Sequence, residues 1–206
     1  MLFKNRQDAG RQLSIELQSL NLKNGLIIGL PRGGVVVAAE IARILDLPLD
    51  IIVPRKIGAP FNSELAIGAL VDDIVLLNEP LIKEFGIDPS YIQSAVAKEK
   101  KEAARRLALF RHGKPSPKFK DQTVIVVDDG IATGATMRAS LRYLKSKGTK
   151  RLIAAVPIAP PETVKQLQHE GFEVVCLYMP VSFAAVGQFY EEFLQTQDAD
   201  VIKLLR

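Results

Sequence analysis

The stretch VIVVDDGIATGATM, residues 124–137, joins an apolar run to two adjacent carboxylates and then to a turn rich in glycine and threonine. The apolar run is typical of a buried strand, and the residues after the turn begin a helical pattern. Asp128 and Asp129 therefore stand at the carboxyl end of a predicted strand, where open parallel sheets bind ligands. The stretch predicts a strand–turn–helix unit that holds a ligand at its turn.

Strand and helix alternate on both sides of this unit. Apolar runs predict strands at 26–30, 49–57, 123–127, 151–159 and 172–180. Helical spacing and terminal glycines predict helices at 5–20, 35–46, 89–111, 137–148 and 161–171. Residues 65–78 are interpreted as two strands joined by a turn, a hairpin at the edge of the sheet. This order predicts an α/β fold, with a mostly parallel twisted sheet flanked by helices on both faces.

Composition narrows the class of protein. A chain of 206 residues, 48% of them hydrophobic, fits a single domain spanning 1–206. No apolar run reaches the ~18 residues of a membrane span and the first residues lack a signal peptide pattern, so a cytoplasmic location without membrane association is expected. The single cysteine, Cys176, excludes an internal disulfide framework. Scattered charges summing to +4 disfavour nucleic-acid binding and are compatible with anionic small molecules.

The turn itself suits a phosphorylated sugar. Small residues let backbone N–H groups approach a phosphate at the start of a helix, and the hydroxyls of Thr133 and Thr136 add donors. The carboxylates of Asp128 and Asp129 repel phosphate, but they can accept hydrogen bonds from sugar hydroxyls or hold a magnesium ion through water. The turn matches neither the Walker A pattern nor the dinucleotide fingerprint.

Two further segments carry cationic residues at predicted strand ends. GLPRGG, residues 29–34, ends one strand and opens a helix, so Gly33 and Gly34 free the backbone beside an anion while Arg32 offers a planar fork to phosphate oxygens. VPRKIGAP, residues 53–60, places Arg55 and Lys56 near the end of another strand. Both segments are expected to meet the ligand of the 124–137 turn.

The segment VIVVDDGIATGAT resembles the motif that binds phosphoribosyl pyrophosphate (PRPP) in type I phosphoribosyltransferases. The resemblance implies that Asp128 and Asp129 bind the ribose hydroxyls and, indirectly, Mg²⁺. It assigns the 5′-phosphate loop to Ala132, Thr133, Gly134, Ala135 and Thr136. It further makes Arg32, Gly33 and Gly34 a pyrophosphate loop, and makes Arg55 and Lys56 the catalytic cations that meet the same pyrophosphate from the opposite side.

The chain is most similar to a branch of this family whose acceptor is unassigned. The shared segments are Phe3–Gly10, Pro31–Gly34, Arg55–Ala69 and Phe183–Tyr190. Family members cover the acceptor with a variable hood, which is placed here at 180–206. One of the aromatic rings of this hood is expected to stack on the acceptor, and the candidates are Phe183, Phe189 and Tyr190.

The chain departs from the family pattern at two places, the residue before the phosphate turn and a long helical insertion. Ala132 stands where several purine-salvage members carry an acidic residue, which disfavours a 6-oxopurine acceptor. A helical insertion at about 78–118 occupies the region of the family's mobile catalytic loop. Its cationic side chains are expected to face water, and they are Arg105, Arg106, Arg111 and His112.

The implied reaction transfers the 5-phosphoribosyl group from Mg-PRPP to a nitrogen acceptor and releases pyrophosphate. Such chemistry depends on positioning and on stabilising the departing anion, which agrees with the lack of a catalytic His or Ser arrangement. The alternative is a regulator that senses PRPP on the same fold. The resemblance identifies no acceptor and is compatible with a homodimer.

Overall fold

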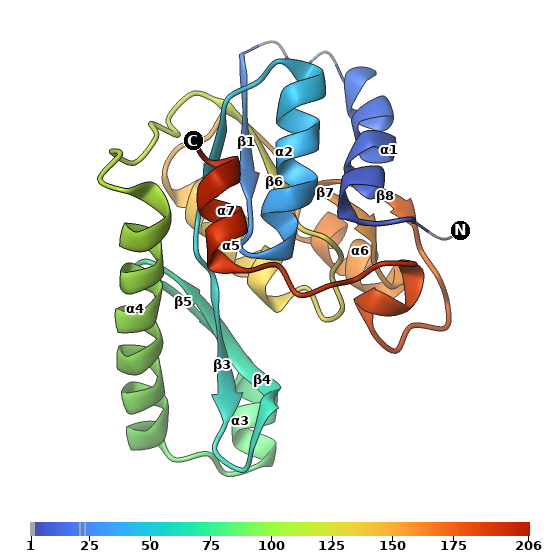
Figure 1. Cartoon of the computed structure of the whole chain (residues 1–206). Coiled ribbons are helices and arrows are strands. Elements are labelled where there is room, and N and C mark those ends of the chain that lie inside the picture. The colour runs from blue at the N-terminus through green and yellow to red at the C-terminus, as the bar shows by residue number, and fades with distance from the viewer. Residues whose placement is uncertain (1–2, 21, 23) are drawn as a thin grey trace.

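A five-stranded parallel sheet forms the centre of the molecule, in the order β2-β1-β6-β7-β8 (Figure 1). The computed structural model describes residues 3–20, 22 and 24–206, and only the backbone of residue 64. The strands are β1 (Gly25–Gly29), β2 (Leu49–Ile51), β6 (Thr123–Val127), β7 (Arg151–Ile158) and β8 (Glu173–Tyr178). All four pairings between them are parallel, as predicted for an α/β fold.

Helices cover both faces of this sheet. They are α1 (Arg6–Gln18), α2 (Gly33–Leu45), α5 (Ala135–Ser146) and α6 (Pro161–His169). Side chains alternate along each strand, so Ile27 and Ile125 pack in one buried cluster with α1 and α2, while Ile28 and Val126 pack in another with α5 and α6. The predicted layers are confirmed. This arrangement directs the loops after β1 and β6 to one edge of the sheet.

A second, antiparallel sheet extends away from the first (Figure 1). The hairpin predicted within 65–78 is present, but it belongs to this second sheet and not to the edge of the main sheet. It consists of β3 (Arg55–Ala59), β4 (Asn62–Val71) and β5 (Ile74–Leu77). The segment 49–57, predicted as one strand, is divided into β2 and β3 around Pro54. Proline cannot donate to a strand ladder, so the chain leaves the main sheet there. We call β3, β4, β5 and the short helix α3 (Glu79–Glu84) the arm.

The long helix α4 (Pro89–Arg111) runs along the arm and back toward the main sheet (Figure 1). Asp88 caps its first turn by accepting from the backbone N–H of Ser90, with proline in the first helical position. Its apolar residues Ala103 and Phe110 are buried in one cluster with Ile57 of β3. Helix α4 thereby fixes the arm to the rest of the molecule.

The C-terminal segment returns to the N-terminus and then crosses to α4 (Figure 1). A 3-10 helix, η1 (Val186–Phe189), precedes a bridge between Phe3 and Tyr190, and helix α7 (Asp198–Leu204) follows. Val201 of α7 is fully buried in the cluster that α4 shares with β3. Within the described ranges, none of the helices has the length and apolar character needed to cross a membrane.

Candidate active site

The loops after β1 and β6 touch each other at the carboxyl edge of the sheet. The two strands are hydrogen-bonded neighbours, and Gly29 pairs with Val127 at their ends. A Cβ atom on Gly33 would lie 1.9 Å from Oδ2 of Asp129, and one on Gly34 would lie 2.8 Å from Cα of Asp128. Only glycine permits this approach. The predicted pyrophosphate loop is therefore packed directly on the predicted ribose-binding carboxylates.

The two carboxylates have different surroundings. The carboxyl of Asp128 accepts a 2.9 Å hydrogen bond from the backbone N–H of Asp129. Burial, and then the neighbouring charge of Asp129, raise the pKa of Asp128 well above its ordinary value. Asp129 is instead paired, through Oδ2, with Nε of Arg6 at 2.6 Å. The two adjacent carboxylates therefore differ in their surroundings, because Asp129 contacts the Arg6 cation whereas Asp128 is buried beside a second carboxylate.

Arg6 is a site residue to which sequence reasoning gave no role. Its guanidinium stacks on the Phe193 ring, 3.8 Å from the centroid, and donates to the carbonyl of Leu194 at 2.7 Å. The hydroxyl of Tyr190 donates to the carbonyl of Asp129 at 2.5 Å. Arg6 could have been found from the sequence, because it is the arginine of the N-terminal segment Phe3–Gly10 that this chain shares with its branch of the family. The C-terminal segment is thus fastened to the carboxylate loop through Arg6.

The predicted 5′-phosphate loop opens the helix α5. Gly134 is the residue before the helix and has a φ of 72°, a conformation that suits glycine. The hydroxyl of Thr163 donates to the carbonyl of Ala132 at 2.6 Å and so fixes the loop from α6. Thr133 is exposed and lines a cleft of about 1120 Å³ between the arm and α5 and α6. The loop's helix N-terminus is therefore accessible to an anion.

Arg55 and Lys56 are adjacent in β3, and their side chains consequently leave opposite faces of the strand. Arg55 pairs with Glu99 of α4, with 2.7 Å between Nε and Oε2. Lys56 lines the large cleft together with Ala132 and Thr133. The structure therefore brings Lys56 toward the phosphate loop and Arg55 toward α4.

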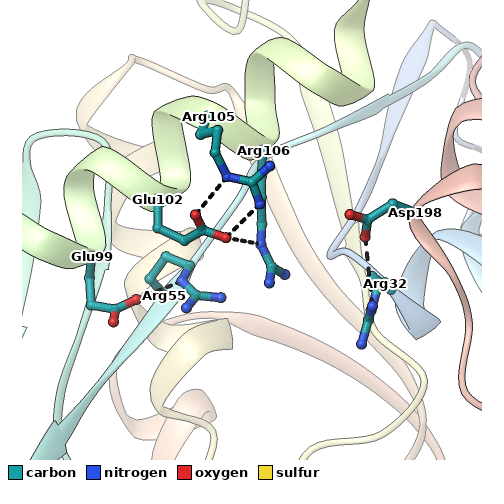
Figure 2. Close-up of polar contacts among 7 residues, drawn as sticks. All are labelled: Arg32, Arg55, Glu99, Glu102, Arg105, Arg106 and Asp198. Atoms are coloured by element: carbon teal, nitrogen blue, oxygen red, sulfur yellow. Dashed lines mark hydrogen bonds and ion pairs between the residues drawn. The ribbon is translucent and has the colours of Figure 1, made fainter.

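Several charged side chains gather where α4, β3, α7 and the pyrophosphate loop meet (Figure 2). Arg32 lies 3.7 Å from Asp198 of α7. Glu102 of α4 accepts from Nε of Arg105 at 2.8 Å and from Nε of Arg106 at 2.7 Å. These two hydrogen bonds lower the pKa of Glu102 to about 2, so it is ionised at neutral pH.

The expectation that the cations of α4 face water is only partly correct. The Arg105 side chain is 58% exposed and His112 is exposed, whereas Arg106 is 25% exposed. Arg111 is buried, at 9%, because it pairs with Asp50 at 3.1 Å and donates to the carbonyl of Ile51 at 2.9 Å. Arg111 is a structural tie between α4 and β2.

The three aromatic residues predicted for the hood are largely packed. Phe189 and Tyr190 are buried in a cluster with Phe3, and Phe183 is partly exposed against the same cluster. The burial gives Phe189 and Tyr190 a packing role and does not support ring stacking on a ligand. Stacking by Phe183 stays a prediction.

A sequence family described as the phosphoribosyl transferase domain matches residues 2–190 of this chain. The chain belongs to this family. The match runs through all three segments that form the site: the Arg32 loop, the Arg55 strand and the Asp128 turn. The resemblance predicted from the 124–136 motif is confirmed.

Relatives agree with this membership of the phosphoribosyl transferase family. The Mycobacterium tuberculosis H37Rv protein Rv0571c, named provisionally as a phosphoribosyl transferase, is 42% identical over 205 residues, covering 99% of this chain and 46% of the relative. The chain thus spans about half the length of that protein. The solved structure of TT1426 from Thermus thermophilus is 40% identical, with a TM-score of 0.84 over 100% of this chain and 98% of that chain. AQ2163 from Aquifex aeolicus, 12% identical with a TM-score of 0.51 over 84% of this chain and 73% of its own, shares the fold.

Proposed function

We propose that this phosphoribosyl transferase family member transfers the 5-phosphoribosyl group of Mg-PRPP to a nitrogen acceptor, with release of pyrophosphate. The proposal rests on the contact between the glycine loop after β1 and the loop after β6 that carries the two carboxylates. Gly33 and Gly34 leave room for the Asp128–Asp129 pair at distances that no other residue would allow. A ligand bearing both a diphosphate and a ribose can span these loops.

Each part of PRPP has a matching group. The 5′-phosphate binds at the N-terminus of α5, where Thr133 and Thr136 add hydroxyl donors. The ribose hydroxyls donate to the carboxylates of Asp128 and Asp129, and the diphosphate lies over the Arg32 loop. This division places the ribose between the two anionic groups, which agrees with the order of those groups in PRPP.

The carboxylates also fit a magnesium ion bound mainly by the substrate. Asp128 and Asp129 stand together, and among the described residues no group of three or more His, Cys, Asp or Glu side chains forms a protein cage. Mg²⁺ keeps several waters and binds substrate phosphates with few protein ligands. When bound, the ion neutralises charge on the departing pyrophosphate.

The remaining catalytic work is electrostatic. Arg55 approaches the diphosphate from the α4 side and Lys56 from the cleft side, while backbone N–H groups of the glycine loop donate to it. Cations that are held before the reaction stabilise charge as it develops on the leaving group. The C-terminal segment packs on one side of the carboxylate loop, where the hydroxyl of Tyr190 donates to the carbonyl of Asp129.

Calorimetry with PRPP tests the binding half of the proposal. PRPP should bind in the presence of Mg²⁺ and bind at least several-fold more weakly without it. Asp128→Asn combined with Asp129→Asn should weaken binding by about tenfold or more, because hydrogen bonds to charged acceptors contribute roughly 1.5–3 kcal/mol each. The matched control is Asp73→Asn, since the Asp73 side chain is 67% exposed at the arm turn. Absence of PRPP binding in the presence of Mg²⁺ would contradict the proposed function.

Turnover separates an enzyme from a PRPP sensor. A screen of nitrogen acceptors for pyrophosphate release identifies the substrate, and the same assay is then applied to Arg55→Ala and Lys56→Ala. Loss of a charge-stabilising donor should reduce turnover by roughly 10²–10³ while PRPP affinity falls much less. Tight PRPP binding without release to any acceptor would instead identify a sensor.

A further inference from the structure

Two carboxylates of α4 each accept a hydrogen bond from the Nε atom of an arginine. Glu99 binds Arg55 through Nε at 2.7 Å, and Glu102 binds Arg106 through Nε at 2.7 Å. Within the part of the chain that the structure describes, each of these two pairs uses Nε alone. Nε is the guanidinium nitrogen nearest the side-chain stem, so the terminal Nη groups keep donors that the paired carboxylate does not occupy.

The groups that α4 contributes lie on one face of that helix. Glu99, Glu102 and Arg106 follow at spacings of three and four residues, which places them in one row along α4. Arg55 joins this row from β3 through its pair with Glu99. In Figure 2 the guanidinium of Arg106 lies on the side of α4 where Arg55 and Arg32 also lie.

Helix α7 connects this row to the pyrophosphate loop. Val201 packs in the buried cluster of α4, and Asp198, one turn earlier, pairs with Arg32 at 3.7 Å. The same Asp198 acts electrostatically on Arg105 of α4. The four arginines and three carboxylates of Figure 2 therefore lie in one region, with an excess of one positive charge.

We propose that Arg106 of α4 is a third arginine of the anion site and, with Arg32 and Arg55, binds the diphosphate group of the ligand. Glu99 and Glu102 are positioning residues that orient Arg55 and Arg106 through Nε and leave their Nη groups to the phosphate oxygens. Bidentate contact of this kind is the geometry in which arginine binds phosphate most strongly. The inference deepens the proposed function and rests on it for the identity of the complete ligand.

Arg105 provides a control within the same group. It is bound to the same Glu102 and carries the same charge, but its side chain is 58% exposed against 25% for Arg106. It also donates twice to Glu102, through Nε at 2.8 Å and Nη2 at 2.9 Å, so its fork is already occupied. A general effect of cationic charge on α4 would involve both arginines alike.

The test measures binding of inorganic pyrophosphate with Mg²⁺ by calorimetry, in the full chain and in Arg106→Ala and Arg105→Ala. Arg106→Ala should weaken binding by about tenfold or more, and Arg105→Ala by no more than about twofold. Thermal unfolding of both variants excludes loss of fold as the cause, and Arg106→Lys provides a second variant that keeps the charge and the packing of the stem. Equal losses in the two alanine variants, or no pyrophosphate binding by the native chain, would overturn the inference.

A double-mutant cycle tests the positioning role of Glu102. If Glu102 orients Arg106, the loss caused by Arg106→Ala should become smaller when measured in a Glu102→Gln background. An unchanged loss would show that Glu102 does not act through Arg106. Pyrophosphate binding is measured without PRPP, so failure of the proposed transfer reaction would leave a positive result for Arg106 intact, and the two failures are distinguishable.

Discussion

At the residue scale, the site depends on two glycines and on an asymmetric pair of carboxylates. Gly34 faces backbone atoms, with Cα of Asp128 and O of Val127 both 2.8 Å from its would-be Cβ, so a side chain there has no room. Asp128 is buried beside a second carboxylate, whereas Asp129 has Arg6 at 2.6 Å. Two adjacent carboxylates, one of them buried, are thus held together where the hydroxyls of the ligand are proposed to bind.

Asp128→Asn should change how stability depends on pH. The pKa of Asp128 is raised by folding, so between its ordinary value and the raised value the folded state binds more protons than the unfolded state. Stability is therefore lost as pH rises through that window, and the uncharged asparagine removes this loss. Thermal midpoints measured from about pH 4 to about pH 8 should show a difference, variant minus native, that becomes more positive with pH.

The same substitution should weaken PRPP binding, which would separate the two roles of the carboxylate. Asp73→Asn at the exposed turn serves as the control, because its charge is solvated in both states. A difference in midpoint that stays constant with pH would mean that Asp128 is ionised in the folded protein at all these pH values.

At the element scale, the middle of α4 contributes Glu102 and Arg106 to the charged group of Figure 2, and its C-terminal end contributes the buried Arg111. The charged band of this helix predicted a partly exposed element, which the exposure of its side chains confirms, but the pattern did not separate Arg106 and Arg111 from Arg105. The difference arises because β3, β4 and α7 pack on one side of the helix, and because Arg111 at its end pairs with Asp50 of β2. Which arginine of a charged run becomes buried is decided by those partners.

Arg111→Met should destabilise the protein by about 3 kcal/mol. It removes the partner of Asp50 and leaves the carbonyl of Ile51 without its donor, and breaking a buried pair leaves an uncompensated charge. Arg105→Met, on the exposed side of the same helix, should leave stability nearly unchanged. Urea unfolding of both variants gives the comparison, and similar values for the two would contradict a structural role for Arg111.

At the scale of the whole molecule, segments near the two ends of the chain meet beside Asp129. The backbone N–H of Glu191 donates to the carbonyl of Phe3 at 2.8 Å, and Arg6 contacts Leu194 and Asp129 at once. Helix α7 then packs on α4 through Val201. Residues from the start and from the end of the chain thereby lie together around the carboxylate of Asp129.

Val201→Asp should detach α7 while the main sheet stays folded. A buried, unpaired carboxylate costs several kcal/mol, which α7 can avoid only by leaving α4, and the thermal midpoint should fall by roughly 5–10 °C. Hydrogen exchange followed by mass spectrometry should show faster exchange in 198–204 than in β6. The control is Lys203→Asp, at an exposed position of the same helix. Unchanged exchange in Val201→Asp would show that α7 is held by other contacts.

Sequence periodicity was sufficient to predict the parallel sheet, its helical layers, and the loops at its edge that contain Arg32 and Asp128. Strand and helix periodicity are local properties, and parallel neighbours necessarily bring their loops to one edge. The folded chain was needed to reveal the arm, the separate directions of Arg55 and Lys56, and the pairing of Arg6 with Asp129. These features depend on contacts between distant segments, such as the 123 positions between Arg6 and Asp129, and no local pattern encodes such a partner.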